Sequence, residues 1–323
     1  MSVHGSIITA SPNQKPVSFT KQIKQSLRRR LSRLHRDKPA LLGFLFHAVF
    51  EDEKDIARGH VDAQQGIRPE HLQRFIEHFL EAGYRFISPE QSLAFAGRRE
   101  KCACITFDDG YFNNLRALPL LEQYDVPATF YITTCNVEKQ QCFWWDVVYR
   151  ERHRRGVDKN RISREQKMLK QKCHPDILSY LHQEFGTDCL QPWSDTDRPM
   201  TITELQDFAR HPLVFIGNHT RDHYLLDQYG YAETEHQIRR AQDDLKNWLG
   251  KAPAGIAYPN GNYSATAMDA ASNLGLTHGW SLDKRKTPLP LEDNNPFALG
   301  RFTLWGRNDI EAQCEITRSD IRL

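Results

Sequence analysis

The sequence predicts an α/β fold in which most strands run parallel. From residue 40 onward, short apolar runs alternate with segments whose apolar residues recur every three or four positions. The chain has 323 residues, 39% hydrophobic and 26% charged, which is the composition of an ordinary globular protein with a sizeable core. Repeated strand–helix alternation implies parallel strands, in either an open sheet or a barrel. In both, functional side chains gather where strands end.

The elements follow from local patterns. Apolar runs predict strands at Leu41–Phe46, Tyr84–Ile87, Cys102–Phe107, Val126–Thr133, Leu213–Ile216, Gly255–Tyr258, Leu276–Leu282 and Arg301–Trp305. Helical spacing predicts helices at Pro69–Ala82, Asn114–Tyr124, Tyr231–Leu249 and, after a cap at Ser264, as far as Asn273. An acidic loop separates the first strand from the first of these helices.

One segment, at about 138–200, breaks the alternation. It begins with the aromatic CFWWDVVY and shows only weak helical periodicity, so we expect a mostly helical insertion over one rim of the sheet. Residues 150–172 carry ten Lys and Arg against three acids. Because the run lacks a nucleic-acid-binding motif, a solvated helix face is favoured and no nucleic-acid partner is expected.

Residues 1–39 form a separate basic segment. After a tail of 14 residues without periodicity, apolar residues recur at helical spacing, and residues 15–38 hold nine Lys and Arg against one acid. This predicts a basic amphipathic helix that either packs on the body or contacts an anionic membrane surface.

The expected location is cytoplasmic, with that membrane contact as a peripheral one. No apolar run reaches the 18 residues or so of a membrane-spanning helix. The longest, at 40–50, lies too far along the chain for a signal peptide and contains His47. The seven cysteines are an odd number without C-x-x-C spacing, which predicts neither a disulfide framework nor a zinc ribbon.

Two acids stand side by side after the strand predicted at Cys102–Phe107. Asp108 and Asp109 are followed by Gly110. Taken alone, Asp-Gly is an ordinary turn signal. The alternative is that the turn presents both carboxylates at the end of the strand, where functional residues collect.

Two histidines follow another predicted strand. His219 and His223 are four residues apart, so on one helical turn both rings would project from the same face, as paired metal ligands do. Two histidines and one carboxylate leave an open position on a tetrahedral ion, which a catalytic metal needs. The alternative is two surface histidines at coincidental spacing.

Together, Thr106–Gly110 (TFDDG) and His219–His223 (HTRDH) resemble the motifs of the polysaccharide deacetylases, the NodB-homology carbohydrate esterases. LPLLEQYDVPATFYI, LLGFLFHAV and AYPNGNY resemble flanking parts of the family, the last in its surface-polysaccharide branch. The resemblance covers roughly residues 40–305, so 40–323 is expected to be one deacetylase domain that contains the insertion. It implies a distorted (β/α) barrel of about seven parallel strands with outer helices.

The resemblance also implies roles. Asp109, His219 and His223 correspond to ligands of a divalent metal, for which zinc is expected, and Asp108 corresponds to the general base that deprotonates the metal-bound water. In the later loop, Pro259 and Asn260 correspond to the substrate side of the site, with a backbone N–H near Asn260 as a second oxyanion donor.

The sequence also departs from the family pattern. Many members carry an Arg two residues before the loop proline, where this chain has Ala257, so the group that holds Asp108 is not identified. A late Leu-x-His motif that supplies the general acid is missing from 301–306. His278 is then a candidate acid or a packed strand residue. His47, at the end of the first strand, is either a substrate-site residue or a buried structural one.

The expected function is metal-dependent removal of N-acetyl groups from amino sugars of a glycan or glycolipid precursor. One rival is a hydrolase of the same fold acting on a formyl group, a small amide or an ester. The other is a glycan-binding homologue without turnover, which the missing Arg and His favour and the intact Asp108 opposes.

Overall fold

A curled, mostly parallel sheet forms the centre of the molecule. The computed structural model describes residues 37–94, 100–291 and 294–320. The sheet has nine strands in the order β7-β6-β5-β4-β3-β1-β8, with β2 pairing with β3 and β9 pairing with β1. The strands are β1 Ala40–Phe46, β2 Arg85–Phe86, β3 Lys101–Phe107, β4 Ala128–Ile132, β5 Val214–Asn218, β6 Gly255–Ala257, β7 His278–Trp280, β8 Thr287–Pro288 and β9 Arg301–Thr303.

The predicted parallel arrangement is confirmed. Among the described strands, the pair of β1 with β8 is antiparallel and every other pairing is parallel. The two ends of the sheet approach each other, because Leu299, just before β9, forms a parallel bridge with Trp280 of β7. The sheet therefore curls into a distorted barrel, as expected.

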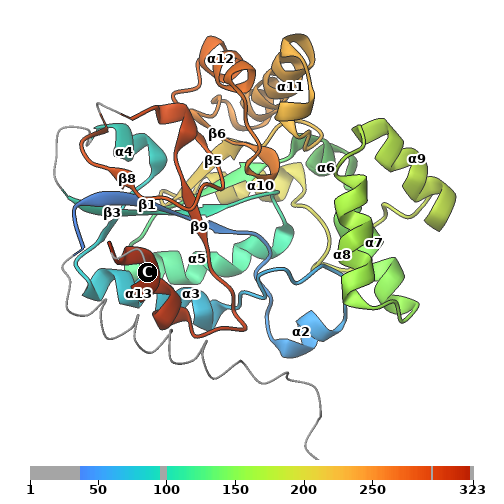
Figure 1. Ribbon diagram of the computed structural model, residues 1–323, viewed down its shortest axis with the longest axis horizontal. Coiled ribbons are helices and arrows are strands. Elements are labelled where there is room, and N and C mark those ends of the chain that lie inside the picture. Colours follow the sequence, from blue (N-terminus) through green and yellow to red (C-terminus); the bar gives the residue numbers. More distant parts are fainter. Residues whose placement is uncertain (1–36, 95–99, 292–293, 321–323) are drawn as a thin grey trace, which may run out of the picture.

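Helices surround the sheet (Figure 1). Their bounds are α2 Glu53–Ala57, α3 Pro69–Glu81, α4 Pro89–Ala94, α5 Leu118–Tyr124, α6 Thr134–Lys139, α7 Trp144–Arg154, α8 Lys159–Leu169, α9 His174–Phe185, α10 Ile202–Ala209, α11 Tyr231–Leu249, α12 Ala265–Asn273 and α13 Ile310–Arg318. Short 3₁₀ turns lie at Phe112–Ala117, Leu226–Gln228, Pro259–Gly261 and Pro296–Ala298. In Figure 1, helices α3, α5 and α13 lie below the sheet, and α11 and α12 lie above it. Among the described residues, no helix is both long and apolar enough to cross a membrane.

The main core lies between β1, β3, β4 and helix α3. Phe44 of β1 packs on Phe75 and Phe79 of α3, with ring centroids 4.7 and 4.8 Å apart. On the neighbouring strands, Phe107 stacks on Phe130 at 4.8 Å. These rings are fully buried, so they fix where β1, β3 and β4 end.

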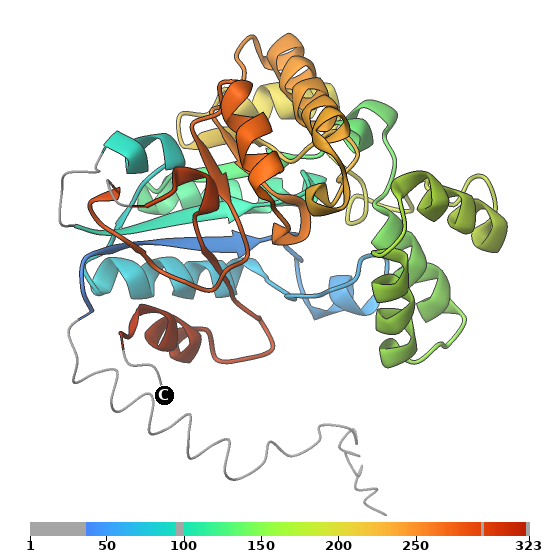
Figure 2. The same cartoon turned by 45° about the horizontal axis from the view of Figure 1, so that its top comes forward.

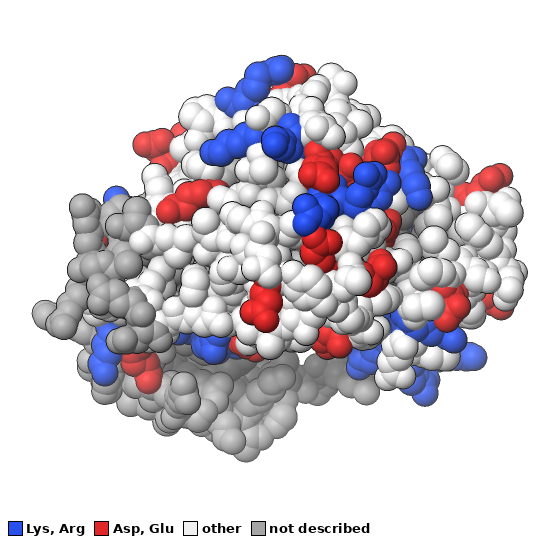
Figure 3. Space-filling model, turned by 90° about the horizontal axis from the view of Figure 1, so that it is seen from above, with Lys and Arg blue, Asp and Glu red and all other residues white. Residues whose placement is uncertain are grey.

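Helices α6 to α9 stand beyond the ends of the strands. The arrow of β1 points toward them in Figure 2. Residues 138–200, read from the sequence as an insertion, hold the last two residues of α6 and all of α7, α8 and α9, and no described strand. On the face shown in Figure 3, basic and acidic side chains lie next to each other.

The structure departs from the expected elements in several places. The acidic loop contains the short helix α2, and the helix expected at Asn114–Tyr124 is a 3₁₀ turn followed by α5. By contrast, α11 has the expected bounds and ends at Gly250 in the left-handed conformation, with φ 76°. The expected N-terminal amphipathic helix lies at residues outside those described.

Candidate active site

A cavity of about 360 Å³ opens at the C-terminal ends of the strands. Its lining comes from the segments that follow β1, β3, β5, β6 and β9, and from α7, α8 and α9. Because these segments are far apart in the sequence, only the barrel brings them together. The volume falls within the range of roughly 300–1,000 Å³ found for small-molecule sites.

The two adjacent acids both line this cavity. Strand β3 ends at Phe107, and Asp109 and Gly110 then adopt positive φ values of 79° and 90°. The backbone N–H of Asp108 still donates to the carbonyl of Phe46 at 3.0 Å, so Asp108 is held at the end of the sheet. The turn signal in the sequence is real, and the turn is what brings both carboxylates to one cavity.

Asp109, His219 and His223 form a three-ligand cluster whose ligand atoms all lie within 4.8 Å of one another. Oδ1 of Asp109 is 3.4 Å from Nε2 of His219 and 3.5 Å from Nε2 of His223. That oxygen is buried and has no hydrogen-bond partner among the described residues. A buried carboxylate oxygen aimed at two imidazoles is a donor set that fits a divalent metal.

The ring orientation of His219 also fits a metal. Its Nδ1 lies 2.7 Å from the carbonyl oxygen of Ala257, to which only a protonated nitrogen can donate. The hydrogen bond therefore places the proton on Nδ1 and leaves the Nε2 lone pair toward Asp109. Ala257 takes part through its backbone carbonyl.

The expected helical turn between the two histidines is wrong. Residues 219–225 form a loop after β5, in which Thr220 and His223 have positive φ values of 65° and 55°. Because the loop turns at Thr220 and His223, the two histidine rings still come together, with centroids 4.9 Å apart. The ring of Trp145 from α7 packs on His223 at 4.6 Å.

The electrostatics of the two histidines differ. Burial lowers the pKa of His223 well below its usual value, with His219 and Lys170 acting in the same direction, so the His223 ring is neutral. Burial would also lower the pKa of His219, but Asp108 and Asp109 outweigh burial and raise it. The cavity floor thus combines concentrated negative charge with ligand nitrogens, an environment suited to a cation.

Arg301 holds Asp108, and sequence reasoning did not identify it. Its guanidinium donates to both carboxylate oxygens, Nη1 to Oδ1 at 2.7 Å and Nη2 to Oδ2 at 2.8 Å. It also donates to Thr106 Oγ1 at 3.1 Å and to the carbonyl of Ser281 at 3.2 Å. Burial would raise the pKa of Asp108, but the charge of Arg301 outweighs it and holds the pKa below the usual range. Asp108 is therefore a carboxylate with a fixed orientation.

His47 lines the same cavity and is oriented by Gln65. The Gln65 side-chain amide donates to the carbonyls of Leu45 and Leu304, so its oxygen is left to accept a hydrogen bond from His47 Nδ1 at 2.8 Å. Nε2 of His47 then lies on the far side of the ring and has no hydrogen bond to any described residue. Sequence reasoning named His47 but missed Gln65.

The remaining expected site residues differ in position. Asn260 lines the cavity, whereas the neighbouring Pro259 is buried and is not among the lining residues. His278 is the first residue of β7, so it lies at the opposite end of the strand from the cavity and is absent from its described lining. Burial lowers the pKa of His278 to about 4. This position gives no support to the expectation that His278 is the general acid.

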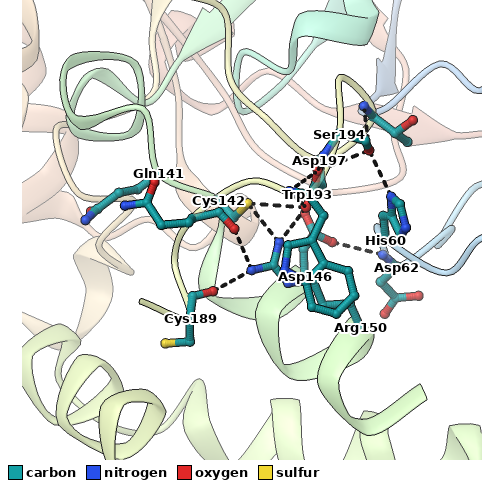
Figure 4. A network of polar contacts seen from close by, with 12 residues as sticks. His60, Asp62, Gln141, Cys142, Asp146, Arg150, Cys189, Trp193, Ser194 and Asp197 are labelled. Carbon is teal, nitrogen blue, oxygen red and sulfur yellow. Dashed lines mark hydrogen bonds and ion pairs between the residues drawn. The ribbon is translucent and has the colours of Figure 1, made fainter. Parts of the chain in front are cut away.

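Asp146 of α7 connects this helix to the active site through hydrogen bonds. Tyr111, next to the acid turn, donates from its hydroxyl to Asp146 Oδ2 at 2.6 Å and accepts from Trp145 Nε1 at 3.1 Å. The backbone N–H of Asp62 donates to the other Asp146 oxygen at 2.9 Å. Figure 4 shows this contact beside a second network, in which Arg150 of α7 pairs with Asp197.

Comparison with known proteins decides the family. The polysaccharide deacetylase family matches residues 96–279, more than half of the chain. The chain belongs to the polysaccharide deacetylase family. It is a hydrolase of this type, which acts on a linear amide bond.

Solved structures agree with the fold. The deacetylase PplD of Streptococcus pyogenes, solved in complex with acetate, is 18% identical with a TM-score of 0.58, over 88% of this chain and 99% of that one. IcaB from Ammonifex degensii is 15% identical with a TM-score of 0.58, over 88% and 100%. The BpsB deacetylase domain from Bordetella bronchiseptica is 16% identical with a TM-score of 0.54, over 84% and 97%. A search of curated proteins found no match.

Proposed function

We propose that this deacetylase removes N-acetyl groups from amino sugars of a glycan or glycolipid precursor, in a metal-dependent hydrolysis with Asp108 as general base. One observation carries the proposal. The cluster of Asp109, His219 and His223 shares a cavity with a carboxylate that Arg301 holds in place. A site that only binds a glycan has no need of an oriented base beside the metal ligands.

Asp109, His219 and His223 would hold the ion. Two imidazoles and one carboxylate suit zinc, and the same set would accept cobalt, nickel or manganese. When bound, the metal supplies Lewis acidity, which polarises the amide carbonyl and lowers the pKa of water to about 7. Trp145 packs against His223 and limits access of bulk water to that ligand.

Asp108 accepts the proton of the attacking water. Its Oδ2 lies 3.9 Å from Nε2 of His219, so the base stands beside the metal ligands without being one of the cluster. Arg301 keeps the carboxylate ionised and fixes both oxygens, which leaves the remaining lone pairs of Asp108 toward the cavity. Arg301 is a positioning residue.

His47 is the proton donor to the leaving nitrogen. Gln65 fixes its ring through Nδ1, and the protonated ring can donate from Nε2, on the other side. In the balanced reaction, the C–N bond breaks, the hydroxyl of water joins the acyl carbon, and the nitrogen gains the proton. The products are acetate and a free amine on the sugar. Asn260, at the rim of the cavity, contacts the sugar.

A glycan or glycolipid precursor is the proposed substrate because a cytoplasmic location is the sequence-based prediction. That location remains a prediction, as does contact of the basic N-terminal segment with an anionic membrane, which lies outside the described residues. Deleting residues 1–36 tests the contact, and unchanged binding to anionic liposomes would count against it.

The function is tested by measuring metal content together with acetate release from short N-acetylhexosamine oligomers. Chelator-treated protein should lose activity and regain it with about one zinc per chain. His223→Ala should lose both metal and acetate release, whereas the matched control His236→Ala, an exposed histidine on α11, should keep both. Formate released from an N-formyl sugar faster than acetate would favour the rival deformylase. Metal-independent acetate release would contradict the proposal.

A further inference from the structure

One face of helix α8 forms a side of the active-site cavity. Lys159, Ile162, Ser163, Gln166 and Lys167, together with the C-cap residue Lys170, line it at successive spacings of three, one, three, one and three residues. Such spacing places them on the same face of a helix. Three of these six residues are lysines, and Lys172 adds a fourth lysine to the lining just after the helix.

The basic run at 150–172 contains arginines that pair with acids of the fold and lysines that line the cavity. Arg152 pairs with Glu165 and Glu184, and Arg154 and Arg155 both pair with Glu151. These arginines are neutralised within the fold.

The cavity lysines are not neutralised in this way. Lys159, Lys167, Lys170 and Lys172 form no ion pair with any of the described residues. Asp62, an acid of the lining, lies close enough to Lys159 and Lys170 to interact with their charges, but its carboxylate accepts a hydrogen bond from Gln166, at 3.2 Å. The side of the cavity formed by α8 therefore carries excess positive charge.

Lys170 connects this charge to the reacting centre. Its Nζ donates to Oδ1 of Asn260 at 2.6 Å, which joins α8 to the loop after β6. Lys170 also lies close enough to Asp109 for the two charges to interact. Lys159 and Lys167 are exposed at the outer part of the cavity, so the cations extend from the rim toward the metal ligands.

We propose that the N-acetylated substrate carries a phosphate ester, which binds against Lys159, Lys167 and Lys170 while its acetamido group lies at Asp109. This inference rests on the proposed deacetylase function. Unpaired lysines suit phosphate, because each ammonium is a compact charge on a flexible stem. The phosphate could belong to a soluble sugar phosphate or to a lipid carrier, which share this chemistry.

The preference for phosphate is measured by kcat/KM for N-acetylhexosamine 1-phosphate and for the neutral methyl glycoside of the same sugar. The phosphate ester should be preferred by roughly tenfold or more, as expected for charged hydrogen bonds, and the preference should shrink as salt is added. Lys167→Gln and Lys170→Gln should lower that ratio about tenfold, and Lys167→Arg should keep most of it. Arg164→Gln, on the outward face of α8, should leave the ratio unchanged.

Equal kcat/KM for the two substrates, or a preference that survives both lysine-to-glutamine substitutions, would overturn the inference while leaving the deacetylase function intact. If neither substrate yields acetate, the deacetylase function fails, and calorimetry of the same full-length protein still decides phosphate recognition. Tighter binding of the 1-phosphate than of the methyl glycoside would support it, and equal binding would overturn it. A polyprenyl phosphate-linked sugar preferred over the soluble phosphate would identify a lipid carrier, and the reverse a soluble ester.

Discussion

Two buried arginine–aspartate pairs serve different purposes in this molecule. Arg301 pairs with Asp108 at the cavity floor, and Arg150 of α7 pairs with Asp197. All four side chains are at most 4% exposed. Removal of either arginine would leave a buried carboxylate without its counter-charge.

What surrounds each pair sets its role. Asp197 accepts from the backbone N–H groups of Trp193 and Ser194, and Arg150 donates to the carbonyl of Cys189 (Figure 4). Arg150 also donates to the carbonyl of Gln191, so the hydrogen bonds of this pair all go to other parts of the fold. Asp108 instead lines the cavity beside a metal-ligand cluster. A buried ion pair alone therefore does not mark a site. An ion pair whose carboxylate lines a cavity, beside a ligand atom without a hydrogen-bond partner, does.

Arg301→Met is expected to have the largest effect, because it affects both the base and the fold. We expect kcat to fall roughly 100-fold, as for loss of a supporting contact at a metal site, and the free energy of unfolding to fall by about 3–5 kcal/mol. Acetate release and chemical denaturation measure the two effects. Wild-type kcat in this variant would show that Asp108 needs no fixed orientation.

Arg150→Met should cost a similar free energy of unfolding, about 3–5 kcal/mol, but leave kcat per folded molecule within about threefold of wild type. The double variant Arg150→Met/Asp197→Leu should recover much of the lost stability, since no unpaired charge remains. A 100-fold loss of kcat in folded Arg150→Met would contradict the distinction between the two pairs.

His47→Gln tests the other side of the cavity. Loss of the proton donor should lower kcat for the amide at least about tenfold, with metal content unchanged. An aryl acetate such as a nitrophenyl ester, whose phenolate can leave without being protonated, should be hydrolysed at nearly the wild-type rate. Equal losses on amide and ester would remove proton donation from the role of His47.

Arg210→Gln should have the smallest effect. Arg210 and Asp207 form an ion pair in which both side chains are largely exposed. Such pairs contribute little, so the free energy of unfolding should change by less than about 0.5 kcal/mol and activity should not change. If Arg210→Gln lowered the free energy of unfolding as much as Arg150→Met, burial would not determine how much these ion pairs contribute to stability.

The parts of the site that the sequence predicts are those encoded locally. The Asp pair with Gly110, and the two histidines after β5, lie directly after apolar runs, so their place at strand ends follows from a few residues. Arg301 lies 193 residues from Asp108 in the sequence, and only the pairing of β9 with β1 beside β3 brings them together. The signal available in the sequence was an arginine at the start of a predicted strand.

Other misses have similar causes. His278 stands in a predicted strand, but the pattern does not show which end of a short strand it occupies. The basic run at 150–172 reads as one charged surface, whereas the fold pairs Arg150, Arg152, Arg154 and Arg155 with acids and leaves the cavity lysines unpaired. Which residues of a helix face a cavity depends on what the helix packs against. The weak periodicity of this segment does not show that.

The most direct test of the account is Asp108→Asn, measured for zinc content and acetate release in parallel. Asn keeps the shape of the side chain but cannot act as a base. We predict wild-type zinc content with acetate release lowered by about 10²–10⁴-fold. Acetate release at the wild-type rate would contradict the account, because Asp108 would then have no part in the reaction.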